Sequence, residues 1–160
     1  MPSILTTDAP EPGLSGAPRP RPAIERRRRP PPATPRDYLQ QLPALVLLNR
    51  LPTPTLAVGL DGEVIYANPA SAAMLGHPDA NASDLTGQPL SSLMAGHAHT
   101  PAHDCVATLR AAAGTVVAWC HVDGYDVHAV VSKALLTRVT DPLLLITLID
   151  VTDALWSSKS

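Results

Sequence analysis

The chain has 160 residues, of which 45% are apolar, and its net charge is −2. This length suits one folded domain with a tail, and this apolar content suffices for a packed core. Aromatic residues make up only 3% and phenylalanine is absent, so the core has to be built from Val, Leu, Ile and Ala. Two cysteines exclude a disulfide framework, and no apolar run approaches the roughly 18 residues that span a bilayer. With no signal peptide apparent, we expect a reduced, cytoplasmic protein.

The first 36 residues differ in composition from the rest and hold ten of the 18 prolines and seven of the 12 basic residues. Proline interrupts helices and sheets, and large apolar groups are few, so we expect residues 1–36 to be a disordered arm. The arm contains a run of four arginines: Arg26, Arg27, Arg28 and Arg29. Such a run is either part of a solvated tail or a contact for nucleic acid, an anionic membrane or an aromatic groove.

Residues 37–50 are expected to form an N-terminal cap helix. Apolar residues recur there at helical spacing: Tyr38, Leu42, Leu45 and Leu48. Pro43 lies inside this run and either kinks the helix or begins a second one. We expect the helix to cover part of a sheet, against Trp119 and Val117. Because Tyr38, Leu42 and Leu45 need an apolar surface to bury, they are also candidates for docking a partner.

The next segment has the pattern of a β-hairpin. Large apolar residues alternate with small ones over 56–60, and residues 64–66 provide the return strand. Asp61 and Gly62 between them predict a two-residue turn, because glycine adopts positive φ at no steric cost.

Two places have the chemistry of a helix start, a capping side chain followed by proline: Asn68-Pro69 and Thr100-Pro101. We expect a short helix over 70–75 and a longer one over 101–113, each closed by the glycine that follows. A single helical turn is expected over 90–94.

A second hairpin is predicted around Asp123-Gly124, between strands over 115–122 and 125–136. A two-residue turn would pair Val122 with Tyr125 and so fix both faces of the strands. The apolar, inward face would hold Val116, Ala118, Cys120, Val122, Tyr125, Val127, Ala129 and Val131. The outward face would hold Trp119, His121, Asp126 and His128. Residues 143–151 are apolar on both sides, which is typical of a central strand.

These elements predict an α+β domain, a five-stranded antiparallel sheet with short helices on one face and an N-terminal helix. We place the domain at residues 51–153, after the cap helix at 37–50, and a short C-terminal tail at 154–160.

Several segments resemble, in order and spacing, the PAS domain family. D-G-E-V-I-Y-A-N at residues 61–68 is similar to the family's D-G-x-I-x-x-x-N hairpin. D-L-T-G-Q-P-L at 84–90 is similar to its E-L-I-G-x-x segment, and D-V-T at 150–152 resembles its closing D-I-T. The resemblance covers roughly residues 42–153.

The resemblance implies a PAS-like sheet with a central cavity on its helical side. It further implies a sensory or interaction module of signal transduction or transcriptional regulation, which forms homodimers or binds a signalling partner. Few residues follow Thr152, so we expect the output to come from association with another chain.

Among cofactors, flavin is not expected, because the reactive-cysteine segment of the family's photoreceptors has no counterpart at residues 76–79. Haem-binding members carry a histidine on the longer helix, where this chain has His103, so a haem-based gas or redox sensor is one alternative. His97, His99, His103 and Asp104 have a spacing that metals accept, but a surface loop rich in histidine explains them better, and no metal site is assigned.

We expect the cavity to accept a small apolar or amphipathic ligand. The candidates for its wall are Met74, Met94, Val106, Leu109, Val116, Ala118 and Cys120. His121 opposite Asp126 is interpreted as a cross-strand pair, and no nucleophile elbow, phosphate loop or zinc-protease motif is present, so no enzyme is expected. A further alternative is an adaptor that binds nucleic acid or membrane through its arginine-rich arm.

Overall fold

The computed structural model describes residues 13 and 30–159. The arginine run and nearly all of the predicted disordered arm lie outside the described residues. The chain divides into two units, Met1–Pro30 and Pro31–Ser160, and all the helices and strands given below belong to the second. None of the described helices is both long and apolar enough to cross a membrane.

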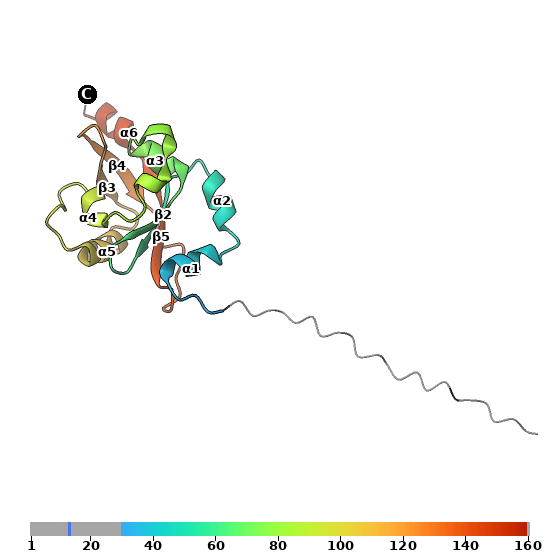
Figure 1. Ribbon diagram of the computed structural model, residues 1–160. Helices are drawn as coiled ribbons and strands as arrows, with labels where there is room; N and C mark the ends of the chain where they lie inside the picture. The colour runs from blue at the N-terminus through green and yellow to red at the C-terminus, as the bar shows by residue number, and fades with distance from the viewer. Residues whose placement is uncertain (1–12, 14–29, 160) are drawn as a thin grey trace, which may run out of the picture. The chain divides into compact units, whose positions relative to one another are not determined.

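The domain contains short helices and five strands (Figure 1). The helices are α1 (Pro35–Gln40), α2 (Leu45–Arg50), α3 (Pro69–Met74), α4 (Leu90–Leu93), α5 (Ala102–Ala111) and α6 (Thr152–Ser157), with 3₁₀ turns η1 (Pro78–Ala80) and η2 (Ala82–Asp84). The strands are β1 (Thr55–Gly59), β2 (Val64–Ala67), β3 (Val116–Cys120), β4 (Asp126–Val131) and β5 (Leu143–Asp150).

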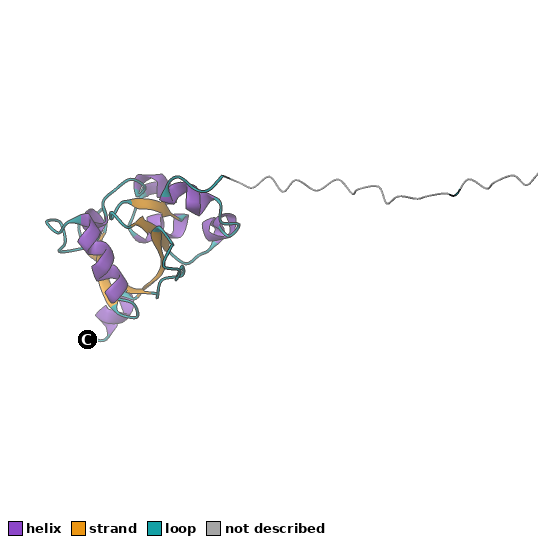
Figure 2. Cartoon of the chain, turned by 90° about the horizontal axis from the view of Figure 1, so that it is seen from below, coloured by secondary structure: helices purple, strands orange, loops and turns teal. Residues whose placement is uncertain are grey.

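The sheet is antiparallel throughout, in the order β2-β1-β5-β4-β3. The predicted central position of residues 143–151 is confirmed, because β5 lies between β1 and β4 and is buried over most of its length. Figure 2 shows helices along both sides of the curved strand layer. The predicted α+β architecture is therefore confirmed.

Each hairpin turn has three residues, and the prediction of two-residue turns is wrong. In both turns the glycine takes a positive φ, +90° at Gly62 and +87° at Gly124. The residues that close the second turn are His121 and Tyr125, since the His121 N–H donates to the Tyr125 carbonyl at 2.9 Å. A turn followed by a glycine in this conformation is a common three-residue hairpin loop. In the first hairpin the same geometry moves Leu60 out of the strand and into the turn, where it is 51% exposed.

The additional turn residue changes the register of the second hairpin by one. Trp119 pairs with Val127 and Cys120 with Asp126, whereas a two-residue turn would have paired Trp119 with His128. A shift of one residue exchanges the two faces of a strand. On β3 the inward residues are therefore Val117 and Trp119, and the predicted inward residues Val116, Ala118 and Cys120 face the other way. On β4 the prediction holds, because Val127, Ala129 and Val131 are buried.

The main core lies between the inner face of the sheet and helices α3, α4 and α5. The helices contribute buried side chains that include Ala72, Leu90, Leu93, Val106 and Leu109. The strands contribute Leu56, Val58, Val64, Trp119, Val127, Ala129, Val131, Leu144, Ile146 and Leu148. Apart from Trp119 and the sulfur-containing Met94 and Cys105, this core is aliphatic, as the composition requires.

Two helices, and not one, cap the outer face. Pro43 lies between α1 and α2, and neither helix includes residues 41–44. Proline lacks the amide that a helix interior needs, so the chain breaks there. The predicted contact with Trp119 and Val117 is also wrong. A second cluster joins Leu39 and Leu48 to Ala57, Leu143 and Leu145, so the helices cover the outer side of β1, β2 and the start of β5.

Asn68 begins α3 as predicted and also connects it to the rest of the domain. Its Oδ1 accepts hydrogen bonds from the Ser71 N–H at 3.1 Å and from the Thr55 N–H at 2.8 Å. Its Nδ2 donates to the carbonyl oxygens of Leu48 and Thr53 at 3.1 and 2.8 Å. One buried amide therefore ties together α2, the entry to β1 and the start of α3. Thr100, by contrast, caps nothing at α5, whose N-cap residue is Pro101.

The C-terminal residues form α6 and not the predicted tail. Thr152 begins this helix, and its Oγ1 accepts a hydrogen bond from the His128 N–H of β4 at 2.9 Å. The same hydroxyl donates to Asp150 Oδ1, at the end of β5, at 2.6 Å. The start of α6 is thus held by two neighbouring strands.

Candidate functional site

The seven predicted cavity residues do not lie on one side of the sheet. Met94, Val106 and Leu109 are buried in the inner core, and Met74 packs against it. Val116, Ala118 and Cys120 are on the outer face, because the register of the second hairpin differs from the predicted one. Cys120, which we expected to be buried, is exposed, while Cys105 on α5 is buried and desolvation raises the pKa of its thiol.

Trp119 occupies the inner position that the prediction gave to its neighbours. The side chain is fully buried, and its indole Nε1 has no hydrogen-bond partner among the described residues. A buried donor without a partner costs about 1–3 kcal/mol. The sequence placed Trp119 outside only because of the assumed turn, whereas its size alone would have favoured the core.

His121 is not paired across the strands with Asp126, and that interpretation is wrong. Its ring stacks on Tyr125, with ring centres 4.1 Å apart, and its Nδ1 accepts the Asp123 N–H at 3.1 Å. The ring lies beside Gly76 at the end of α3. His121 therefore fastens the tip of the second hairpin to α3.

The histidines considered for haem or metal lie apart from the core. His103 is on the solvent side of α5, where its Nε2 is 3.2 Å from a carboxylate oxygen of Asp104 and its side chain is 67% exposed. His97 Nδ1 lies 3.4 Å from the hydroxyl of Thr100. Within residues 30–159, no group of three or more His, Cys, Asp or Glu side chains is arranged to hold a metal ion.

The partner-docking candidates of the N-terminal helix pack within the chain. Tyr38, Leu42 and Leu45 are partly buried against the outer cluster. The Tyr38 hydroxyl donates to Asp141 Oδ1 at 2.6 Å. This hydrogen bond, together with desolvation and the negative charge of Asp141, raises the pKa of Tyr38. These side chains therefore hold α1, α2 and the residues between them to the domain.

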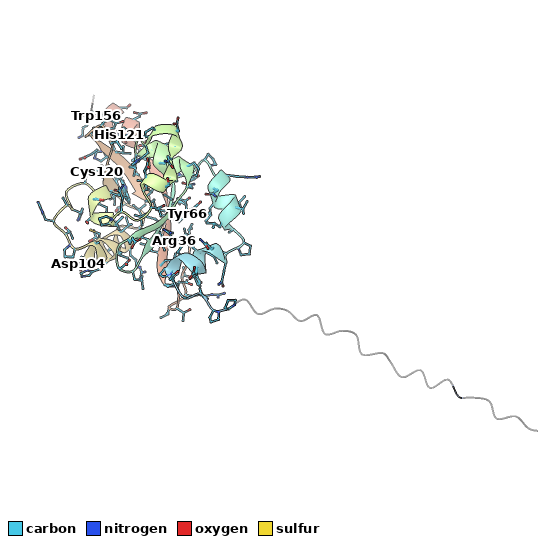
Figure 3. The ribbon with its side chains drawn as sticks, in the orientation of Figure 1. Arg36, Tyr66, Asp104, Cys120, His121 and Trp156 are labelled. Atoms are coloured by element: carbon cyan, nitrogen blue, oxygen red, sulfur yellow. The ribbon has the colours of Figure 1, made fainter. Side chains whose placement is uncertain are left out.

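The outer side of β3, β4 and the end of β5 forms an apolar surface that α1 and α2 leave uncovered. Strand pairing places Val116, Val130 and Ile149 in one row across three strands. Val116 is 44% exposed and Ile149 is 61% exposed. We call this surface the open face, and its residues are Val116, Ala118, Cys120, Asp126, His128, Val130 and Ile149. In Figure 3, Cys120 of the open face is labelled at the same end of the domain as His121 and as Trp156 of α6.

Comparison with known proteins identifies the family. The model of the PAS fold matches residues 45–151, and the chain belongs to this family. The matched residues contain all five strands and the helices α2, α3, α4 and α5, and they leave out α1 and α6. A comparison with curated proteins finds no match.

Solved structures share the fold at low sequence identity. One is a domain of a sensory box sensor histidine kinase/response regulator from Geobacter sulfurreducens, with a TM-score of 0.53 and 16% identity, covering 71% of this chain and 96% of that one. Another is the PAS domain of an HTR-like protein from Haloarcula marismortui, with a TM-score of 0.50 and 14% identity, covering 66% and 86%. A third is a PAS domain from Desulfitobacterium hafniense, with a TM-score of 0.50 and 15% identity, covering 64% and 95%. These likenesses show the fold.

Proposed function

We propose that this PAS domain is a sensory and interaction module of signal transduction or transcriptional regulation that acts by association, and that its open face pairs two copies of the chain. The observation that carries the proposal is the apolar row Val116, Val130 and Ile149 across three strands, in which Val116 and Ile149 are exposed and Val130 is partly exposed. An apolar row of this kind gains free energy when a second surface removes it from water.

The composition of the open face favours burial. It contains no lysine or arginine, and its charged side chain Asp126 lies at the end of β4, away from the central row. The cores of protein interfaces are depleted in charged residues, because long charged side chains are costly to desolvate. The partly exposed small residues Ala118 and Cys120 allow another backbone to approach closely.

Self-association is the simplest use of such a surface. In a twofold pair the same patch serves both copies, so each apolar residue contributes twice. The covered half of the sheet is unsuited to this role, since α1 and α2 already pack on it. A ligand or partner that alters the open face would then change the association and so transmit a signal.

The test is the molar mass in solution of the full chain, measured by sedimentation equilibrium over a range of concentrations. We expect the wild type to form dimers, and Ile149→Asp or Val116→Asp to weaken them at least about tenfold, because each places two carboxylates in the interface. Val139→Asp is the matched control, since Val139 is fully exposed in the loop between β4 and β5.

A wild type that stays monomeric at every concentration would overturn the pairing proposal. Dimers that survive both open-face substitutions would do the same, because the interface would then lie elsewhere. Circular dichroism and thermal unfolding of each variant separate loss of pairing from loss of folding.

A further inference from the structure

A groove runs along the outer side of α5, away from the open face. One part, of about 390 Å³, is lined by Leu60 and by His103, Val106, Ala107, Arg110 and Ala111 of α5. A second part, of about 360 Å³, shares Leu60 and Arg110 and continues to the β4–β5 loop, where Leu136 and Arg138 contribute. The α5 residues recur at helical spacing, so they form one stripe along the helix.

The groove combines an apolar floor with positive charge. Leu60 projects into it from the first hairpin turn and is 51% exposed, although its side chain is wholly apolar. Arg110 and Arg138 line the groove from two different elements. Neither guanidinium group has a carboxylate oxygen within 4.0 Å among the residues that the structure describes, where the ion pairs are those of His77, His103 and His121.

One carboxylate does line the groove, but each of its two oxygens already accepts a hydrogen bond from the protein. Asp141 accepts from the Tyr38 hydroxyl at 2.6 Å and from the Arg138 N–H at 2.7 Å, and it is only 9% exposed. It therefore holds the loop between β4 and β5 in place. The guanidinium groups of Arg110 and Arg138 form no ion pair among the described residues and can bind an anion.

We infer that this groove binds an amphipathic carboxylate, a molecule with one anionic head and a medium-length apolar chain. Guanidinium groups form paired, charge-assisted hydrogen bonds with carboxylates. The apolar chain would cover Leu60, Ala107 and Ala111, which are exposed and which a purely polar anion would leave in water. The site is separate from the open face, so the inference does not rest on the proposed self-association.

The probe is decanoate, titrated into the full chain and followed by calorimetry and by amide chemical shifts. We expect shifts centred on α5, the first hairpin turn and the β4–β5 loop. Decanol, which has the chain without the charge, and acetate, which has the charge without the chain, should each bind at least about tenfold more weakly. Binding should also weaken as salt is raised, because exposed charges are screened.

Substitutions test the two halves of the site separately. Arg110→Gln should weaken decanoate binding about tenfold, while Arg50→Gln, an exposed arginine on α2, should leave it unchanged. Leu60→Ser should weaken decanoate binding, because it removes an apolar contact with the alkyl chain of the ligand. Leu47→Ser, at the exposed surface of α2, should leave decanoate binding unchanged.

Three results would overturn the inference. The first is decanoate binding that Arg110→Gln leaves unchanged, and the second is equal affinity for decanol. The third is a set of shifted amides that lies outside the groove. Because all four substituted side chains are exposed, thermal unfolding should confirm that each variant is folded.

Discussion

The imidazole of His121 occupies the space that Gly76 leaves open by having no side chain. A Cβ on Gly76 would lie 2.2 Å from two atoms of the ring. Next to this contact, the Val122 N–H donates to the Leu75 carbonyl at 3.0 Å. Gly76 has a φ of +81°, which L side chains adopt at a cost. The tip of the second hairpin and the end of α3 therefore depend on one glycine.

Gly76→Ala should destabilise the domain by about 2–4 kcal/mol, because backbone strain adds to the overlap with the ring. Gly96→Ala is the control, since Gly96 also has a positive φ, +78°, but a Cβ added there would have no neighbour within 4 Å. That control should cost about 1–2 kcal/mol. Urea denaturation measures both values, and equal losses would show that the ring contact contributes nothing.

Asn68→Ala should destabilise the domain by about 3 kcal/mol or more, because the buried Thr55 N–H loses Oδ1 as its acceptor and the carbonyls of Leu48 and Thr53 lose Nδ2 as a donor. Asn81→Ala is the control. Asn81 also accepts a backbone hydrogen bond, from Ser83, but it is exposed and water can replace it. The control should lose about 1 kcal/mol or less. Similar losses in the two variants would contradict the central role of Asn68.

Trp119→Phe should change stability by no more than about 1 kcal/mol, because it keeps an aromatic ring in the core and removes a donor that has no partner. Trp119→Ala should cost about 3–5 kcal/mol, since it leaves a large cavity. Equilibrium unfolding followed by circular dichroism compares the two. A large loss in the phenylalanine variant would show that the indole N–H does have an acceptor in solution.

The raised pKa of Tyr38 makes stability depend on alkaline pH. A folded-state pKa above the unfolded value of 10.0 means that the hydroxyl stabilises the fold below pH 10 and loses this effect as pH rises through the folded pKa. Burial raises the pKa of Tyr66 and adds a dependence of the same sign. Tyr38→Phe should therefore lose less stability than the wild type between about pH 8 and about pH 11. Urea denaturation at both pH values measures these changes. If the wild type and Tyr38→Phe lose the same free energy of unfolding between them, the hydroxyl of Tyr38 does not cause the dependence on pH.

Elements with local signals could be predicted from the sequence. Asn68 followed by Pro69 specifies a helix start by chemistry that involves only adjacent residues. The apolar run of β5 indicates a strand covered on both faces, and this places it at the centre of the sheet.

Features that depend on a one-residue choice or on distant contacts could not be predicted in this way. The Asp-Gly pair is compatible with a turn of two residues and with a turn of three. The length of the turn decides whether Trp119 or Cys120 lies on the inner face of β3. The pairing of Tyr38 with Asp141 joins positions far apart in the chain, and no periodic pattern signals it. The candidate site changed accordingly, from an inner cavity wall to the open face.

The hydroxyl of Thr152 sets the direction in which the last helix leaves the domain. It is hydrogen-bonded to His128 on β4 and to Asp150 at the end of β5. A small shift of these two strands relative to each other would therefore change the orientation of α6. The exposed indole of Trp156 lies one turn further along that helix, so its surroundings would change with the position of the helix. In the Trp119→Phe variant, Trp156 is the remaining tryptophan of the chain, so its fluorescence would follow movements of α6.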